Sequence, residues 1–285
     1  MQYERVAVIG IGQMGASFAL AGKKHDLIGH VIGVARTEAT RRNALQTGAA
    51  DECTEDAAAA VQEADLVYLS VPVGAMGTVM KTIAPALKAG CVITDAGSTK
   101  EAICRLAGEL LPDRVQFIGG HPMAGTERQG PLHADATLFE GTTYLLCPGR
   151  ADDDTLDAFM GLIRAIGAEP VIVDEREHDR MLAYSSHLPH LTAVVLSIAL
   201  ADSNVDELAQ FGAGGLRDTT RIAAGSVEMW RDIFSENRRH ILTAAKELRA
   251  ILDATIEAIE DENVAEIERL LDRAHRFRSD LYSEN

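Results

Sequence analysis

The feature that most constrains this chain is a change of pattern near residue 173. Before it, short apolar and β-branched runs alternate with amphipathic stretches; after it, only helical periodicity remains. Alternation of this kind is typical of a parallel sheet wrapped by helices. The sequence therefore predicts an α/β fold, with a doubly wound sheet in residues 1–173 and an all-α domain in residues 174–285.

The apolar runs give the expected strands, because each is short and mostly apolar throughout, as strands buried on both faces are. We predict strands at 5–10, 31–35, 65–71, 91–95, 115–119, 143–147 and 170–173.

The C-terminal helices show apolar residues at spacings of three, four or seven. One helix carries Ile241, Ala245, Leu248, Leu252 and Ile259, and the next carries Val264, Ile267, Leu271, Ala274 and Phe277. A domain of about 110 residues does not easily hide so much apolar surface. We predict a homodimer formed through these helices, with a monomeric bundle as the alternative.

Composition limits the partners. The 43 acidic and 27 basic residues give a formal net charge of −16, which would repel nucleic acid and anionic membranes over most of the surface. No run reaches the roughly 18 apolar residues of a membrane helix, and the N-terminus runs straight into a strand. The four scattered cysteines form no Cys-x-x-Cys pair, and we expect reduced thiols and no metal site. We therefore expect a cytoplasmic protein with a small-molecule substrate, no nucleic acid and no membrane.

A glycine-rich turn joins the first strand to an alanine-rich helix. Its first glycine permits the tight turn, its second lets backbone amides approach a pyrophosphate, and its third allows the helix to pack on the strand. This context predicts a Rossmann-type dinucleotide site, although a glycine turn alone is weak evidence. The cofactor residues that we assign are Gly10, Ile11, Gly12, Gln13, Met14 and Gly15 of the turn, with Ser70, Val71 and Pro72 after a later strand.

The end of the second strand informs the choice of cofactor. Enzymes that prefer NAD usually place an acidic residue there to bind the ribose, whereas this chain has Ala35, Arg36 and Thr37. A guanidinium can pair with a 2′-phosphate, so the sequence favours NADP over NAD. A solvated or adenine-stacking Arg36 is the alternative.

His121 lies in Gly-Gly-His-Pro-Met-Ala-Gly-Thr-Glu (119–127), predicted to be a loop at the carboxyl end of a strand, where α/β sheets place ligand chemistry. This segment closely resembles a motif of the prephenate and arogenate dehydrogenases, the enzymes of tyrosine biosynthesis. Four further segments occur in the family's order and, with the glycine turn, span nearly the whole chain. They are Asp95-x-x-Ser98-x-Lys100, Ser186-His-Leu-Pro-His190, Gly215-Leu-Arg-Asp-Thr-Thr-Arg-Ile-Ala223 and Met229-Trp-Arg-Asp-Ile233.

The resemblance implies oxidative decarboxylation of a cyclohexadienol, with hydride transfer to NAD or NADP. It makes His121 the group that accepts or strongly hydrogen-bonds the proton of the ring hydroxyl. It also implies that Ser98 hydrogen-bonds both His121 and that hydroxyl. It makes Arg221 the anchor of a substrate carboxylate and His187 a substrate-site residue. Further substrate-site candidates are Arg217, Thr126, Glu127 and Trp230.

Simpler roles remain open for several of these residues. Ser98 with Glu101 fits a Ser-x-x-Glu capping box, which is compatible with catalysis. Arg217 can pair with Asp218, and His190 is expected to pack behind the site. Glu127 can be solvated, and a lone tryptophan such as Trp230 often belongs to a core.

Two other functions compete with this interpretation. The glycine turn also resembles that of β-hydroxyacid dehydrogenases, but these use a lysine in a later glycine-rich helix, and the one lysine after residue 100 is Lys246, outside such a context. A nucleotide-binding redox sensor without turnover would not need a histidine, a serine and a carboxylate-binding arginine together. We expect neither a fused chorismate mutase domain nor a separate amino-acid-binding domain in this sequence.

Overall fold

The computed structural model describes residues 2–125, 128–203, 205 and 208–282. Its contacts divide the chain into two compact units, residues 1–238 and 239–285. The first unit holds the sheet together with the helices up to α11.

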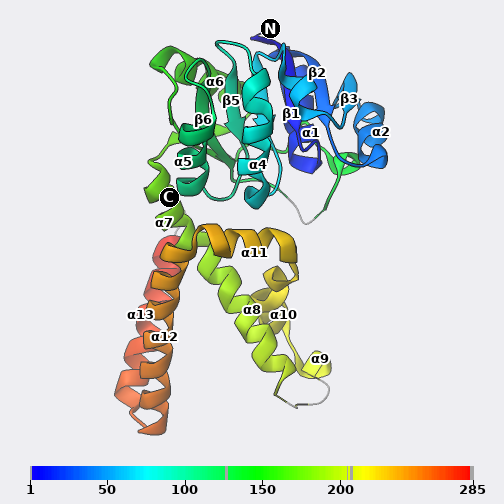
Figure 1. The fold of residues 1–285 in the computed structure, drawn as a ribbon. Helices are drawn as coiled ribbons and strands as arrows, with labels where there is room; N and C mark the ends of the chain where they lie inside the picture. Colours follow the sequence, from blue (N-terminus) through cyan, green and yellow to red (C-terminus); the bar gives the residue numbers. More distant parts are fainter. Residues whose placement is uncertain (1, 126–127, 204, 206–207, 283–285) are drawn as a thin grey trace. The chain divides into compact units, whose positions relative to one another are not determined.

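The sheet has eight strands in the order β3-β2-β1-β4-β5-β6-β7-β8 (Figure 1). All neighbouring pairs are parallel except β6 and β7. The first six strands follow the order of a Rossmann sheet, whose order reverses between β1 and β4. The predicted fold is confirmed. The strands are β1 (Tyr3–Ile9), β2 (Ile28–Val34), β3 (Glu52–Thr54), β4 (Leu66–Leu69), β5 (Val92–Asp95), β6 (Gln116–Pro122), β7 (Thr143–Cys147) and β8 (Glu169–Ile172).

Two details differ from the sequence prediction. The short strand β3 was not predicted, because three residues with partly polar side chains at a sheet edge leave no apolar run. His121 was predicted to lie in a loop, and this was wrong: β6 continues through Pro122, and His121 pairs with Leu145 of β7. The antiparallel pairing with β7 extends the strand beyond its apolar segment.

Helices cover both faces of the sheet and form two separate cores. Phe18 and Phe159 pack on one face from α1 and α6, whereas Met76 and Ile103 pack on the other from α4 and α5. These faces are mostly apolar, as the strand composition predicted. The helices of this part are α1 (Gln13–Lys24), α2 (Glu38–Gln46), α3 (Ala57–Val61), α4 (Val73–Ile83), α5 (Glu101–Leu110) and α6 (Asp153–Ala165), with the 3₁₀ turns η1 (Ala84–Ala86) and η2 (Pro131–His133).

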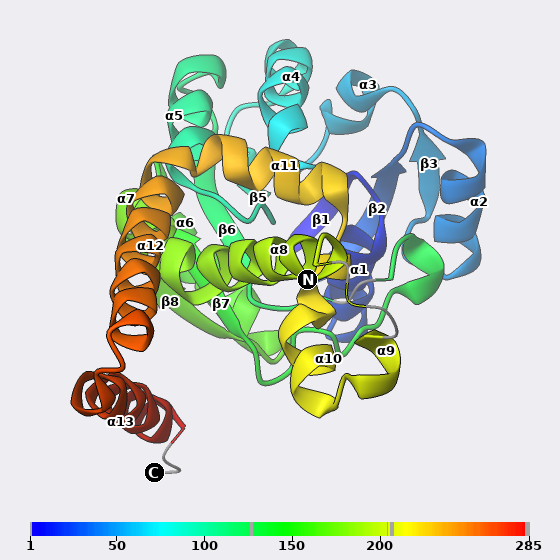
Figure 2. The same cartoon turned by 90° about the horizontal axis from the view of Figure 1, so that it is seen from below.

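The rest of the first unit is helical (Figure 2). Its longest stretch runs from α7 through a π-helical turn, η3, into α8. Pro189 lacks an N–H group and so cannot continue the regular hydrogen-bond ladder at this point, which accounts for an irregular turn there. The elements are α7 (Glu175–Leu182), η3 (Ala183–His187), α8 (Leu188–Ala201), α9 (Leu208–Phe211), α10 (Gly214–Thr220), η4 (Arg221–Ala224) and α11 (Val227–Glu236).

The second unit is a helical hairpin. The two predicted helices are confirmed as α12 (Arg238–Glu260), which starts at the unit boundary, and α13 (Val264–Leu281). Asn263 caps α13 by accepting a hydrogen bond from the Glu266 amide at 3.2 Å. Several apolar side chains of the hairpin are more than half exposed, namely Leu252, Ile259, Val264, Leu271 and Phe277. Within the described residues, no helix is both long and apolar enough to span a membrane.

Candidate active site

The glycine turn between β1 and α1 has the geometry that a dinucleotide site needs. Gly10 has φ +87°, and a Cβ atom there would lie 2.7 Å from Val71 Cγ1. A Cβ atom on Gly15 would lie 2.7 Å from Val8 Cγ1, so both residues are required by the packing of the turn. Gly12 differs, because its nearest neighbour would be 4.0 Å away. The fold itself therefore leaves space at Gly12, where the sequence predicts that a pyrophosphate approaches.

The surroundings of the turn fit the same ligand. Gly12 is the N-cap of α1, and it makes no side-chain capping bond. A helix N-terminus of this kind attracts phosphate through its backbone N–H groups and its dipole. Ser70 begins the predicted Ser70–Pro72 segment and donates its amide hydrogen to Ile9 O at 2.8 Å, so this segment lies beside the turn. The residues present fit a nicotinamide dinucleotide.

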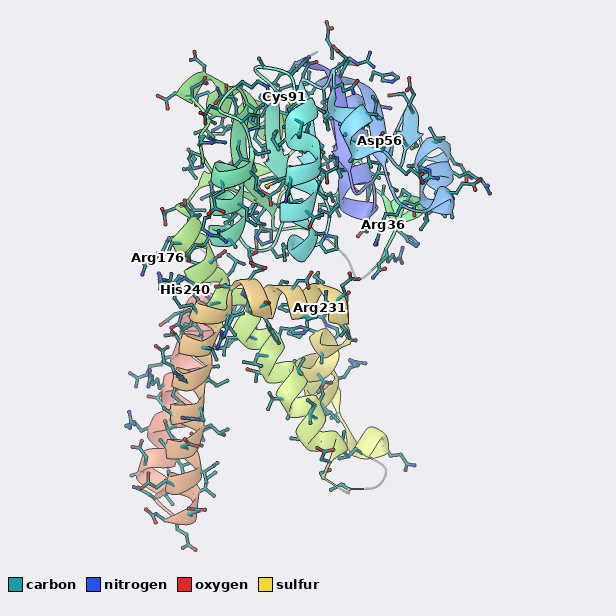
Figure 3. The ribbon with its side chains drawn as sticks, in the orientation of Figure 1. Arg36, Asp56, Cys91, Arg176, Arg231 and His240 are labelled. Carbon is teal, nitrogen blue, oxygen red and sulfur yellow. The ribbon has the colours of Figure 1, made fainter. Side chains whose placement is uncertain are left out.

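The end of β2 carries two cationic side chains, of which one is exposed and one is partly buried. Arg36 is exposed there (Figure 3), and Thr37 is the N-cap of α2. Arg41 donates to the carbonyl oxygens of Ala35 at 2.7 Å and Arg36 at 3.0 Å. Two guanidinium groups thus lie at the position where the ribose of a dinucleotide is expected.

A buried carboxylate ties the Ser98 segment to the strand that carries His121. Asp95 accepts hydrogen bonds from the amides of Gly97, at 2.7 Å, and Gly120, at 3.1 Å, and it pairs with the buried Lys100 ammonium. Half-buried Ser98 therefore lies in a segment fixed at the carboxyl ends of β5 and β6. The structure brings the two predicted catalytic segments together.

The predicted capping box at Ser98 is not formed. The N-cap of α5 is Lys100, and no side chain of that residue caps the helix. Instead, the Asp179 carboxylate of α7 accepts hydrogen bonds from the amides of Lys100, at 2.7 Å, and Glu101, at 3.0 Å. A residue distant in sequence therefore accepts the hydrogen bonds at the start of α5, and Ser98 does not cap this helix.

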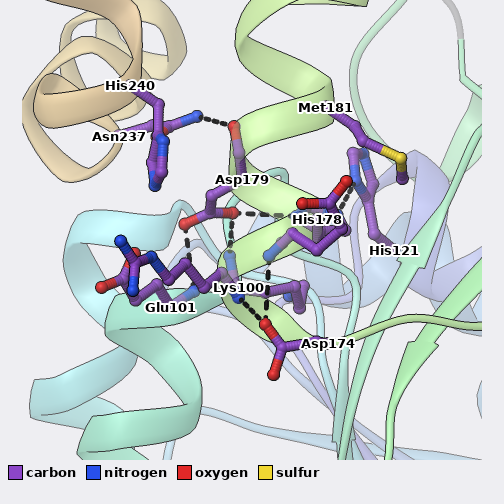
Figure 4. A network of polar contacts seen from close by, with 12 residues as sticks. Lys100, Glu101, His121, Asp174, His178, Asp179, Met181, Asn237 and His240 are labelled. Atoms are coloured by element: carbon purple, nitrogen blue, oxygen red, sulfur yellow. Dashed lines mark hydrogen bonds and ion pairs between the residues drawn. The ribbon is translucent and has the colours of Figure 1, made fainter.

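His121 is buried and joined to a second histidine (Figure 4). Its Nδ1 atom lies 2.9 Å from Nε2 of His178, and Nδ1 of His178 lies 2.8 Å from Oδ1 of Asp179. Burial lowers the pKa of His121 well below its usual value, and nearby His178, Lys100 and His187 lower it further. The imidazole is therefore neutral at pH 7, as a base must be.

The helical part contributes a second cluster. Asn237 Nδ2 donates to Asp179 O at 2.7 Å and lies 3.1 Å from Nδ1 of His187. His190 stacks on Trp230 with ring centroids 3.4 Å apart, and its buried Nδ1 atom has no hydrogen-bond partner among the described residues. His190 therefore packs against Trp230, as predicted. Its Nδ1 atom is in addition available for a hydrogen bond with a ligand.

The predicted arginines lie on the segment that leads to this stack. Arg221 opens η4 and is exposed, and a Cβ atom on Gly225, just after that turn, would lie 2.7 Å from Trp230 Nε1. Arg217 lies 3.7 Å from Asp218, and both side chains are largely exposed. An exposed pair of this kind contributes little to stability. Thr126 and Glu127 lie outside the described residues.

Sequence reasoning missed the residues that link the two clusters. His178, Asp179 and Asn237 are all buried, and the chain from His121 to His187 runs through them. Their burial and their partners depend on contacts between segments distant in sequence, so no local pattern identifies them.

Buried His187 should make the protein sensitive to acid. Burial lowers the pKa of His187 from 6.5 to about 4. Between these two values His187 is protonated in the unfolded chain and neutral in the folded one, so stability is lost as the pH falls from about 6.5 to about 4. We expect the free energy of unfolding to fall by about 2 kcal/mol between pH 7 and pH 5 from this residue alone. Denaturant titrations at both pH values should show a smaller pH dependence in His187→Gln; an equal dependence would contradict the assignment.

Comparisons with known proteins agree with this geometry. Residues 18–172 match the family model "Prephenate dehydrogenase, nucleotide-binding domain", and residues 174–273 match "Prephenate dehydrogenase, dimerization domain". The chain is 33% identical to the prephenate dehydrogenase of Bacillus subtilis over 98% of its own length and 76% of that protein.

Solved structures show the same relationship. Prephenate dehydrogenase from A. aeolicus, in complex with hydroxyphenyl propionate and NAD⁺, superposes with a TM-score of 0.91 at 30% identity, covering 99% of each chain. Synechocystis arogenate dehydrogenase gives a TM-score of 0.83 at 28% identity, covering 97% of this chain and 99% of that one. The chain belongs to the prephenate dehydrogenase family.

Proposed function

We propose that this protein oxidatively decarboxylates prephenate or arogenate, with hydride transfer to NAD(P), in tyrosine biosynthesis. The observation that carries the proposal is the buried, neutral His121, tied through Asp95 to the Ser98 segment, in a sheet with a built dinucleotide turn. Relatives named for both substrates support it. The products would be 4-hydroxyphenylpyruvate from prephenate or tyrosine from arogenate.

The proposed roles follow from the chemistry of each side chain. When bound, the nicotinamide supplies the hydride acceptor. His121 accepts the proton of the ring hydroxyl as hydride leaves the same carbon, and the proton returns to the oxygen when the ring carboxylate departs as carbon dioxide. Ser98 donates or accepts a hydrogen bond at that hydroxyl. Aromatisation of the ring supplies the driving force, so the protein mainly orients the reactants.

Substrate binding is assigned to the helical cluster. Arg221 anchors the side-chain carboxylate of the substrate, and His187 and Trp230 border the pocket. Thr126, Glu127 and Arg217 remain proposed contacts. We add His190 to this group, because its buried Nδ1 atom has no hydrogen-bond partner in the described part of the chain.

For the cofactor, we propose a preference for NADP over NAD. Exposed Arg36, with Arg41 beside it, supports pairing with a 2′-phosphate. We expect Arg36→Asp to lower kcat/KM for NADP relative to NAD by about tenfold or more, equivalent to about 1.4 kcal/mol. Steady-state kinetics with both cofactors measure this ratio, and an unchanged ratio would show that Arg36 does not bind the phosphate.

We also propose that residues 174–285 form a substrate-binding and dimerisation domain. The exposed apolar residues of α12 and α13 support a homodimer, as does the description of the matching family model. Sedimentation equilibrium should give twice the mass of one chain. A cytoplasmic location is part of the proposal and is supported by four cysteines that all remain free thiols.

The proposed function is tested by a matrix of prephenate and arogenate against NAD and NADP. Turnover with either substrate is the expected result. Nucleotide binding without turnover of any cyclohexadienyl compound would favour a redox sensor instead.

A further inference from the structure

We propose that His178 and Asp179 are positioning residues that hold His121 in its Nδ1–H tautomer, so that Nε2 presents the lone pair that accepts the substrate proton. This inference rests on the proposed function for its catalytic consequence. The tautomer itself follows from the hydrogen bonds of the network in Figure 4.

Asp179 fixes the direction of each hydrogen bond from His178 to His121. Its carboxylate accepts from two backbone amides at the N-terminus of α5 and lies 2.8 Å from Nδ1 of His178. Burial alone would raise the pKa of Asp179, but the hydrogen bonds from His178 and from the two amides lower it below its usual value. The positive end of the α5 dipole favours the anion as well. Because a charged carboxylate only accepts, Nδ1 of His178 carries the hydrogen.

His178 lies between Asp179 and His121 in this network. Burial lowers its pKa, and Lys100 lowers it further, whereas Asp179 and Asp95 act in the opposite direction. The net result is a neutral ring at pH 7. A neutral imidazole with hydrogen on Nδ1 has a lone pair on Nε2, and that atom lies 2.9 Å from Nδ1 of His121.

His121 must donate from Nδ1, because Nε2 of its partner His178 can only accept. The hydrogen therefore sits on Nδ1 of His121, and Nε2 holds the lone pair. The charged and titratable groups that act on His121 are His178, Lys100 and His187, and with burial all of them oppose protonation of the resting ring. The base is thus neutral and correctly oriented before the substrate binds.

The network is held from several elements, which keeps the orientation fixed. His121 lies on β6, the amides lie at the start of α5, and His178 and Asp179 lie on α7. Asn237, at the end of α11, donates to the backbone carbonyl of Asp179 at 2.7 Å. All three members of the chain from His121 to Asp179 are buried, so water does not compete for these bonds.

The substitution Asp179→Asn tests the chain of donors directly. Asparagine has one oxygen in place of two. With that oxygen in the position of Oδ2 it accepts from the Glu101 amide, and its NH₂ group, in the position of Oδ1, donates to Nδ1 of His178 while the Lys100 amide loses its acceptor. His178 then carries hydrogen on Nε2, donates to His121, and leaves His121 with hydrogen on the atom that should act as the base. We expect kcat to fall by about 10²- to 10⁴-fold, as for a wrong tautomer in other enzymes, with unchanged affinity for the nucleotide.

The matched control is Asp174→Asn, the same change at the exposed N-cap of the same helix, where the carboxylate accepts from the amides of Arg176 and Glu177. It should keep wild-type turnover. At His178, Gln offers an oxygen that can accept from His121, so His178→Gln should retain far more activity than His178→Leu. Equal losses in these two variants would contradict a positioning role.

A second readout does not depend on turnover. In protein with ¹⁵N-labelled histidine, the signals of His121 are assigned by their loss in His121→Asn. Wild type should show hydrogen on Nδ1, and Asp179→Asn should show it on Nε2. Hydrogen on Nε2 of His121 in the wild type would overturn the inference even if the enzyme is active, whereas hydrogen on Nδ1 in a protein that turns over no cyclohexadienyl substrate would contradict only the proposed function.

Discussion

Replacing His121 by asparagine is expected to lower kcat by about 10²- to 10⁴-fold, the usual contribution of a positioned acid or base. Asparagine fills part of the same space and can still hydrogen-bond His178, but it cannot take up the hydroxyl proton. The glycine turn and the end of β2 are untouched, so the dissociation constant for the nucleotide should change little. Steady-state kinetics and nucleotide titration together measure both quantities.

The matched control is the same substitution at His25, which is exposed at the C-terminal end of α1. His25→Asn should retain wild-type kinetics. Near-normal turnover of His121→Asn would remove this residue from the mechanism.

Truncation of Arg221 to alanine is expected to raise KM for the substrate by about 10- to 100-fold, since a hydrogen bond to a charged group contributes about 1.5–3 kcal/mol. The carboxylate that Arg221 is proposed to hold does not react, and its binding persists from the ground state to the transition state. An interaction of that kind affects KM more than kcat. Initial rates over a wide range of substrate concentration separate the two.

Arg217→Ala provides the comparison for Arg221. Arg217 lies one helical turn earlier on α10, largely exposed and near Asp218, so its loss should raise KM by a smaller factor. An unchanged KM in Arg221→Ala, or a larger effect at Arg217, would move the anchor of the substrate carboxylate to another residue.

The sheet could be predicted from sequence because its signals are local. Each predicted strand is a short apolar run, and the glycine turn carries its own geometric requirement at Gly10 and Gly15. The helices α12 and α13 follow from spacing alone. In each case, a few residues close together in sequence determine the local structure.

The parts that were missed depend on contacts distant in sequence. The extension of β6 through His121 requires β7 as a partner, more than twenty residues later. The cap of α5 comes from Asp179 and not from the nearby Ser98, because the carboxylate of α7 reaches the helix end. The link from His121 to His187 likewise runs through three buried polar residues, two on α7 and one just after the end of α11, and no spacing rule connects them.

The central claim is that His121 deprotonates the ring hydroxyl, and the most direct test is a crystal structure of this protein with NAD(P)⁺ and a substrate analogue that keeps that hydroxyl. We predict that Nε2 of His121 lies about 2.6–3.2 Å from the hydroxyl oxygen, the reach of a general base. A structure in which another side chain holds that oxygen and His121 lies away from the nicotinamide ring would contradict the account.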